Sequence, residues 1–485
     1  MNGPPGTVGV AGCRVLLAGR ISRMRNGVKL LAWVLAVGVL SAQGVRTVSL
    51  VVTNGTVVTM DGTGRVLPAA GVAVDADRIV AVETAAELAR RFKGRQTINA
   101  AGGIIMPGLI NTHTHAPMVL YRGLADDLAL MEWLEQYIFP AEAKTVSPAF
   151  VRTGTRLAAL EMIESGTTTF ADMYYFESDI AKVTAEAGLR GVLGQTVIQF
   201  PVADARTPQE GLARAEAFIT EWARHPLITP AVAPHALYTL DAATLKAARD
   251  LSVKHGAPML IHMAETEAET ATAQERGASS AVAYLDSLGV LGKGVLGAHG
   301  VWVSPADVAV LKAREVGIAH NPASNMKLAS GVAPVPAYLA ASVALGLGTD
   351  GAASSNDLDM FTAMRLAALL HKSQARDPRV VPARAAVGMA TIGGARALGL
   401  DAVTGSLEVG KRADLIVVGV DGARQTPLFD PLSHLVYVAH GSDVQCTVVN
   451  GRILMRNRKV LSLNPAAVLG EARAAAQAVR AAVAR

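Results

Sequence analysis

Short apolar runs rich in β-branched residues follow one another from Val48 onward, separated by Asn-Gly and Asp-Gly pairs. Runs of this kind between such turns predict antiparallel hairpins. The same pattern returns late in the chain, at residues 413–418 and 444–454. We therefore expect one small β domain that is assembled from both terminal segments.

Between these segments the pattern changes to apolar strands that alternate with amphipathic helices. Residues 152–165 precede an apolar run at 167–170, and residues 242–255 precede another at 259–262. Repeated strand and helix units predict a parallel sheet with right-handed crossovers. Eight such units would close into a (β/α)8 barrel, in which chemistry is found at the carboxyl ends of the strands.

These patterns divide the chain into five segments. We expect a leader at residues 1–44, the first part of the β domain at 45–105, the barrel at 106–400, the second part of the β domain at 401–461 and a C-terminal helix at 462–485. The last segment is rich in Ala and Arg and suggests no chemistry.

The leader has the pattern of a secretory signal peptide. Basic residues extend to Lys29, an apolar run covers residues 30–40, and Ala42 and Gly44 are small residues at a cleavage-site spacing. The run is short for a membrane span, which needs about 20 residues, so no stable span is expected in the mature chain. We expect export to the periplasm or the exterior; the alternatives are an uncleaved anchor or a cytoplasmic enzyme.

The formal net charge of +5 comes from the leader, which holds five basic residues and no acidic one. The rest of the chain is therefore balanced and offers no basic footprint for nucleic acid. A small molecule is the partner that we expect, and the sequence leaves open whether the chain forms a homo-oligomer.

Four residues at strand ends form a candidate metal site. His113 and His115 lie two apart at the end of an apolar strand, so that both imidazoles can face one ion. His262 and Asp350 end two further apolar strands. Three imidazoles and one carboxylate suit one Zn²⁺ that keeps a water, and Fe²⁺ or Mn²⁺ would fit the same ligands.

Three residues near these ligands suggest hydrolytic chemistry. Zn²⁺ lowers the pKa of its bound water from about 15.7 toward about 7, which gives hydroxide near neutral pH. We expect Asp350 to take the water proton and His299, at another strand end, to hold the hydroxide in line. Glu265, three residues after His262, is expected to carry a proton to the substrate, as a non-ligand glutamate does in zinc nucleobase deaminases of a different fold.

The other histidines carry weaker signals. His235 also ends an apolar strand, although for His235 and His299 a structural, hydrogen-bonded imidazole is the alternative. Five more histidines lie in helical or loop contexts and are expected to be surface or packing residues: His225, His255, His371, His434 and His440.

Several longer motifs accompany these residues, at 107–115, 161–169, 262–265, 320–328, 348–354 and 405–415. Together they resemble the amidohydrolase superfamily and, more narrowly, the 5-methylthioadenosine and S-adenosylhomocysteine deaminases, over residues 48–457. The resemblance implies a distorted TIM-like barrel with a small β-sandwich domain built from the N- and C-terminal segments. It also implies that His113, His115, His262 and Asp350 hold Zn²⁺.

The same resemblance implies contacts to a nucleoside substrate. Glu142 matches the position that contacts the ribose, and His235 and Glu265 match further substrate contacts. The family's substrate-binding arginines have no clear counterpart, because the surroundings of Arg206 do not align. The group attached to the 5′ carbon of the sugar therefore stays open.

The leading hypothesis is a zinc-dependent deaminase that releases ammonia from an adenosine-type nucleoside, methylthioadenosine or S-adenosylhomocysteine. One alternative keeps the metal site but takes another amino or chloro heterocycle, a guanine-like base or a triazine. A second alternative is a non-catalytic barrel scaffold, which predicts lost ligands, whereas all four are present.

Overall fold

The computed structural model describes residues 44–483, in which residues 45–483 belong to one compact unit. The expected leader lies outside the described residues apart from Gly44. Within the described range, none of the helices combines the length and the apolar character that crossing a membrane requires.

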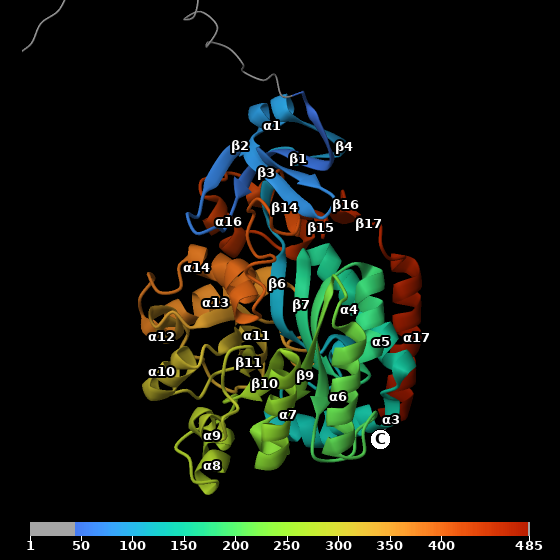
Figure 1. Ribbon diagram of the computed structural model, residues 1–485, viewed down its shortest axis with the longest axis vertical. Coiled ribbons are helices and arrows are strands. Elements are labelled where there is room, and N and C mark those ends of the chain that lie inside the picture. Colours follow the sequence, from blue (N-terminus) through green and yellow to red (C-terminus); the bar gives the residue numbers. More distant parts are fainter. Residues whose placement is uncertain (1–43, 484–485) are drawn as a thin grey trace, which may run out of the picture. The chain divides into compact units, whose positions relative to one another are not determined.

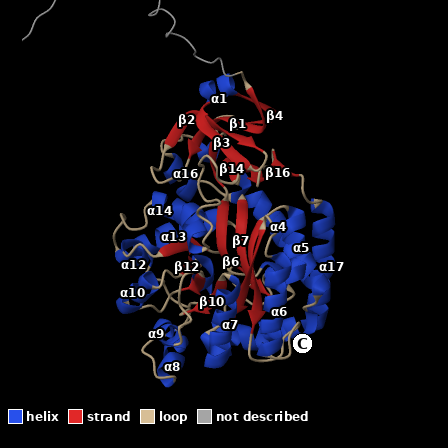
Figure 2. Cartoon of the chain, viewed as in Figure 1, coloured by secondary structure: helices blue, strands red, loops and turns tan. Residues whose placement is uncertain are grey.

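Eight strands form the parallel sheet of a barrel (Figures 1 and 2). In chain order they are β6 (Leu109–Thr114), β7 (Thr167–Tyr174), β8 (Arg190–Val197), β9 (Ile228–Pro234), β10 (Met259–Met263), β11 (Val295–His299), β12 (Gly317–His320) and β13 (Ala344–Leu347). Each pairs in parallel with the next. The Asp350 amide donates to the His113 carbonyl (3.0 Å) beyond the end of β13, which joins the first and last strands. The predicted barrel fold is confirmed.

Helices cover the barrel strands from outside. In chain order they include α4 (Pro148–Ser165), α5 (Glu177–Ala187), α6 (Pro208–Trp222), α7 (Ala242–His255), α8 (Glu267–Glu275), α9 (Ala281–Ser287), α10 (Pro305–Ala313), α11 (Pro322–Lys327), α12 (Val335–Ala340), α13 (Met360–Ala375) and α14 (Ala383–Gly388). Asp241 caps α7 by accepting from the Thr244 amide. Every residue of β8 is buried, as expected for a parallel strand that is covered on both faces.

An irregular helical segment between β6 and α4 lines the pocket described below. It consists of α2 (Leu130–Trp133), the π-helical turn η2 (Leu134–Ile138) and α3 (Phe139–Thr145). π-turns inside helices are frequent at functional sites. At the end of the chain, α17 (Pro465–Val483) packs against α3 and α4.

Strands from both ends of the chain form a second, nine-stranded sheet. They are β1 (Arg46–Val58), β2 (Val66–Asp75), β3 (Arg78–Thr84), β4 (Phe92–Asn99), β5 (Ile104–Pro107), β14 (Leu415–Val418), β15 (Val444–Val449), β16 (Arg452–Arg456) and β17 (Lys459–Val460). The two terminal segments meet where β5 pairs antiparallel with β14. The second domain is thus built from both terminal segments, as predicted.

Alternating side chains on β5 connect the second domain to the barrel. Ile105 packs in the core of the second domain, whereas Ile104 and Met106 pack in the large core that continues into the barrel. This alternation follows from the two-residue period of a strand. The boundary expected between residues 105 and 106 falls within β5, and the division into five segments stays a prediction.

Candidate active site

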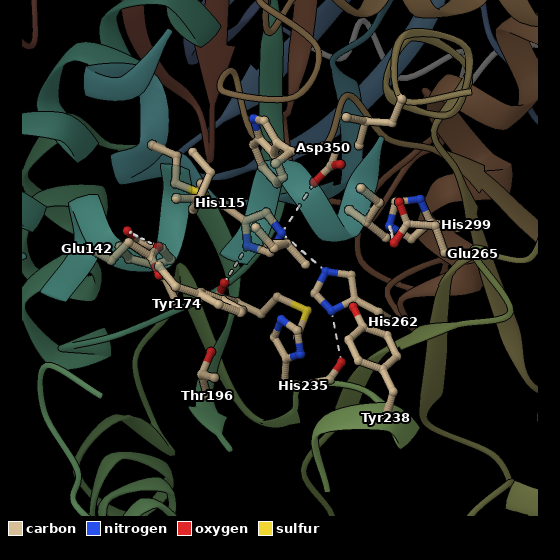
Figure 3. Close-up of a pocket in the computed structure, with 18 of the residues that line it drawn as sticks. His115, Glu142, Tyr174, Thr196, His235, Tyr238, His262, Glu265, His299 and Asp350 are labelled. Atoms are coloured by element: carbon tan, nitrogen blue, oxygen red, sulfur yellow. Dashed lines mark hydrogen bonds and ion pairs between the residues drawn. The ribbon is translucent and has the colours of Figure 1, made fainter. Parts of the chain in front are cut away.

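Histidine and carboxylate side chains converge at the carboxyl ends of the barrel strands (Figure 3). β6 carries His113 and leads into His115, β10 carries His262, β11 ends at His299, and Asp350 follows β13. The ligand atoms of His113, His115 and His262 lie within 4.8 Å of one another, and so do those of His113, His299 and Asp350. The structure therefore brings the four predicted ligands and His299 to one place.

The hydrogen bonds behind two of these imidazoles show that the group suits a cation. Nδ1 of His115 lies 2.7 Å from the Met173 carbonyl, and Nδ1 of His262 lies 2.8 Å from the His235 carbonyl. A carbonyl only accepts, so both Nδ1 atoms carry a hydrogen, and Nε2 is the atom of each ring that has a lone pair when the ring is neutral. These two Nε2 atoms are 3.2 Å apart, so that one cation could be bound by both.

Asp350 supplies the negative charge of the group. Its Oδ1 lies 3.3 Å from Nε2 of both His113 and His115, while Ser324 and Ser354 donate to its Oδ2 (2.7 and 2.8 Å). Burial opposes ionisation, but these histidine contacts hold the pKa of Asp350 well below its usual range. Nε2 of His113 is buried with no hydrogen-bond partner, as expected of a ligand atom in a metal site.

Glu265 and His299 form a second, adjacent pair. Oε2 of Glu265 lies 3.6 Å from Nε2 of His299, and burial raises the pKa of Glu265. Nδ1 of His299 faces Oδ1 of Asn325 at 2.8 Å, which leaves Nε2 directed at the site. His299 and Asp350 both have positive φ (76° and 64°). Such backbone angles in non-glycine residues are concentrated at functional sites.

Glu142 lies on the other side of the histidines from Glu265 (Figure 3). The Tyr174 hydroxyl donates to its Oε1 at 2.6 Å. Burial raises the pKa of Glu142 to about 7. This carboxylate is thus buried, yet it lines a pocket that a ligand can enter.

His235 presents a hydrogen-bond acceptor to the same pocket. The Thr239 hydroxyl donates to the Ala236 carbonyl (3.2 Å), so it accepts from Nδ1 of His235 (3.0 Å). Nε2 of His235 is then the lone-pair atom. Burial lowers the pKa of His235 to about 3, which keeps the ring neutral.

A single pocket connects these groups. The empty space around them, including the part open to solvent, is about 580 Å³. Its polar lining includes His115, Glu142, His235, His262, Glu265, His299 and Asp350, and its apolar lining includes Trp133, Leu134 and Phe139. A second cavity adjoins it, because Phe139, Glu142 and Tyr175 line both.

Two residues that support the site were not singled out from the sequence. Oδ1 of Asp172 accepts from the Thr114 hydroxyl (2.7 Å) and the Ala116 amide (2.5 Å), on either side of His115. Glu269 accepts from two backbone amides next to Glu265. Asp172 follows an apolar run within β7, two residues before the strand ends, which was a signal in the sequence, whereas only the four-residue spacing from Glu265 pointed to Glu269.

The five histidines expected to be surface or packing residues do not line the pocket. His371 is buried and its Nε2 lies 3.2 Å from Nε2 of His320. Arg206 is not part of the pocket lining either. Its side chain is exposed.

Known proteins are similar to this chain in sequence and in fold. A 5-methylthioadenosine/S-adenosylhomocysteine deaminase of Syntrophobacter fumaroxidans is 44% identical over 437 residues, 90% of this chain and 100% of the relative. A 5′-deoxyadenosine deaminase of Methanosarcina acetivorans is 46% identical over 382 residues, 78% of this chain and 87% of the relative. The crystal structure of an adenosine deaminase from Xanthomonas campestris with bound zinc is 39% identical, covers 90% of this chain and 100% of its own, and has a TM-score of 0.88.

The match to a protein family covers most of the described chain. Residues 104–454 match the amidohydrolase family, a span that contains all eight barrel strands and the residues of the candidate site. Together with relatives of 44% and 46% identity, this match shows that the chain belongs to the amidohydrolase family of metal-dependent hydrolases.

Proposed function

We propose that this protein is a zinc-dependent deaminase that converts an adenosine-type nucleoside and water into the corresponding inosine-type nucleoside and ammonia. The observation that carries the proposal is the pairing, in one pocket, of a histidine and aspartate metal group with a buried carboxylate on each side. Relatives of 44% and 46% identity are named as deaminases of such nucleosides, and a relative of 39% identity holds zinc.

His113, His115, His262 and Asp350 would hold the ion. A bound ion would lower the pKa of a water molecule toward about 7 and so would supply a nucleophile at neutral pH. His299 presents Nε2 to hold that water in line. Asp350, whose pKa lies well below its usual range, would accept the water proton.

Glu265 transfers a proton to the substrate in this proposal. Because burial raises its pKa, the carboxyl can give a proton to the ring nitrogen next to the carbon that carries the amino group. The amino group receives the proton that Asp350 took from the water and leaves as ammonia, while the hydroxyl proton on the attacked carbon returns to Glu265. General acid and base groups of this kind contribute typically about 10²–10⁴-fold to the rate.

Glu142 distinguishes nucleosides from free bases. A carboxylate that accepts hydrogen bonds from two sugar hydroxyls is a strong and geometrically specific partner. Glu142 and Glu265 lie on opposite sides of the histidines (Figure 3) and both line the pocket, which supports a substrate with the base at one end and the sugar at the other.

The test is ammonia release from adenosine, 5′-deoxyadenosine, methylthioadenosine, S-adenosylhomocysteine, guanine and an aminotriazine, with metal content measured alongside. We expect turnover of the nucleosides only, about one zinc per chain, and a loss of kcat/KM of roughly 10²-fold in Glu142→Ala. Turnover of guanine or the triazine that is unaffected by Glu142→Ala would instead support the alternative substrates.

A further inference from the structure

The turn that carries Glu265 is held by a second buried glutamate. Glu269, in the first turn of α8, accepts from the Ala264 amide at Oε2 (3.0 Å) and from the Glu265 amide at Oε1 (2.7 Å). One carboxylate thus receives hydrogen bonds from two consecutive backbone amides, one of which belongs to Glu265 itself. Glu269 is 1% exposed.

We infer that Glu269 is a positioning residue for the proposed deamination, which fixes the direction of the Glu265 side chain through the backbone of residues 264 and 265. This inference rests on the proposed role of Glu265, although the geometry of the turn does not. No role for Glu269 follows from metal binding or from contact with the substrate, because Glu269 does not line the pocket.

The turn needs such a support because its backbone is in an unfavourable conformation. Ala264 has a φ of 52°, in the left-handed region that alanine rarely adopts. Its carbonyl accepts from the amides of Val301 and Trp302 (2.9 and 2.8 Å), beyond the end of β11. Ala264 is therefore held from both sides, through its amide by Glu269 and through its carbonyl by the segment that follows His299.

The contacts of the Glu265 side chain, by contrast, are long. Ser330 donates to Oε1 at 3.4 Å, and Nε2 of His299 lies 3.6 Å from Oε2. The carboxyl that must reach the substrate is thus free to exchange protons, while its backbone is fixed by the 2.7 Å bond to Glu269. The hydrogen bonds of a catalytic side chain are often long before the substrate binds. The backbone that carries such a side chain, in contrast, needs firm support.

The two amide hydrogen bonds favour the anionic form of Glu269 and partly offset the effect of its burial. Burial and the nearby Glu265 raise its pKa to about 7, and the two amide hydrogen bonds act in the opposite direction. The first turn of a helix further favours a negative charge. Charge-assisted bonds from backbone amides are about twice as strong as neutral ones, so an amide in place of this carboxylate should weaken both.

The experiment compares Glu269→Gln with Glu267→Gln in the full chain. Glutamine keeps the shape of Glu269 but turns an NH₂ group toward one of the two amides, so that one hydrogen bond is lost. Glu267 is exposed and lies in the same first turn of α8, which makes its variant a matched control for charge. Steady-state kinetics on the best nucleoside, metal content and amide hydrogen exchange at residues 264 and 265 are measured for both.

We expect Glu269→Gln to lower kcat by roughly 10–100-fold with KM within about threefold of the unmodified protein and full metal content. Exchange at the two amides should rise roughly tenfold. Glu267→Gln should leave all four quantities unchanged.

Three results would overturn the inference. Unchanged exchange in Glu269→Gln would show that the carboxylate does not hold the turn. Faster exchange with kcat unchanged, or an equal loss of kcat in Glu267→Gln, would show that holding the turn does not position Glu265. If the unmodified protein is inert on all nucleosides, the proposed function fails, and the exchange and metal measurements still decide whether Glu269 holds this turn.

Discussion

Each of two imidazoles of the candidate metal site is oriented by one backbone carbonyl behind it. Met173 supplies that carbonyl for His115, and His235 supplies it for His262. Such outer partners fix the tautomer and the ring direction of a ligand. The direction in which each Nε2 atom points is therefore fixed by the fold and not by the ion. The residues that fix it belong to β7 and to the segment after β9.

Metal binding should release about one proton from His115. Burial lowers the pKa of this ring, but the hydrogen bond and the charge of Asp350 raise it to about 9 in the absence of an ion. Below that pH the metal-free ring is protonated, and an ion must displace the proton. Apparent zinc affinity should therefore fall about tenfold for each pH unit below about 9.

Calorimetric titration with zinc at about pH 6, where a metal-bound water with a pKa of about 7 stays protonated, in two buffers of different ionisation enthalpy, checks this prediction. The expected result is a heat that differs between the buffers by the amount for about one proton. Equal heats in both buffers would contradict it, since they would mean that His115 is already neutral.

Replacement of Glu265 should separate catalysis from metal binding. Glu265→Gln keeps the size of the side chain but cannot give or take the proton, so kcat should fall by about 10²–10⁴-fold while zinc content stays near one per chain. Asp350→Asn, in contrast, should lower zinc content, because the anionic partner of His113 and His115 is lost. The measurements are ammonia release and metal analysis; a Glu265→Gln protein with ordinary turnover would refute the assigned role.

Residues differ in how well the sequence reveals them. His113, His115, His262, His299 and Asp350 were predictable as a group, because a polar residue that ends an apolar strand must lie at the mouth of a barrel. Glu142 lies on the short helix α3, where the order of polar and apolar residues does not distinguish a buried glutamate from an exposed one. Only the family resemblance could therefore single it out. Glu269 acts through backbone amides, and no side-chain pattern reports such a contact.

At the scale of elements, regular strands and helices were the predictable part. β-branched runs between turn residues predicted hairpins near the N-terminus. The Asp61-Gly62 pair does separate β1 from β2, which pair antiparallel, whereas the turn expected at Asn54-Gly55 was wrong, because this pair lies within β1, where the register shifts. The π-turn at Leu134–Ile138 could not be predicted, because it depends on packing and leaves no repeating pattern. That turn nevertheless decides where Phe139 and Glu142 enter the pocket.

The cavity beside Glu142 should select the group on the 5′ carbon of the sugar. Besides Glu142, its lining consists of Phe139, Ala143, Tyr175, Phe200, Pro201, Val202 and Ala203, and none of these described residues is cationic. An amino acid carboxylate placed there would lose water without gaining a partner. We therefore expect kcat/KM for methylthioadenosine to exceed that for S-adenosylhomocysteine by roughly 10–100-fold.

Competition between these two nucleosides, followed by separation of the products, measures this ratio directly. Ala203→Arg adds a guanidinium at an exposed position of the lining, and it should reduce the ratio by favouring the carboxylate. A ratio near one in the unmodified protein would show that the 5′ group lies elsewhere.

At the scale of the whole molecule, one buried ion pair joins the barrel to the second domain. Arg190, at the start of β8, donates from Nε and Nη2 to the two carboxylate oxygens of Asp414 (2.9 and 3.2 Å). Both side chains are at most 5% exposed. Asp414 also accepts from the Asn450 amide (2.7 Å), which ties the connection to the end of β15.

Removal of this carboxylate should lower stability without affecting chemistry. Asp414→Ala leaves Arg190 buried without its partner, and breaking such a pair costs about 3–5 kcal/mol. Arg314→Ala, which breaks an exposed pair with Asp286, should change the free energy of unfolding by less than about 1 kcal/mol. Denaturant unfolding measures both, and a large loss of kcat/KM in folded Asp414→Ala would contradict a purely structural role.

The leader gives the last prediction at this scale. Residues from Val45 onward form one compact unit in which the described part contains the whole candidate site. A chain that starts at Val45 should therefore keep its zinc content and a kcat within about twofold of the full chain.

If the leader is a signal peptide, mass spectrometry of the protein recovered from a secreting host should find Val45 as the first residue, after the small residues Ala42 and Gly44. Full-length protein recovered only from the cytoplasm would contradict export, while leaving the catalytic proposal intact.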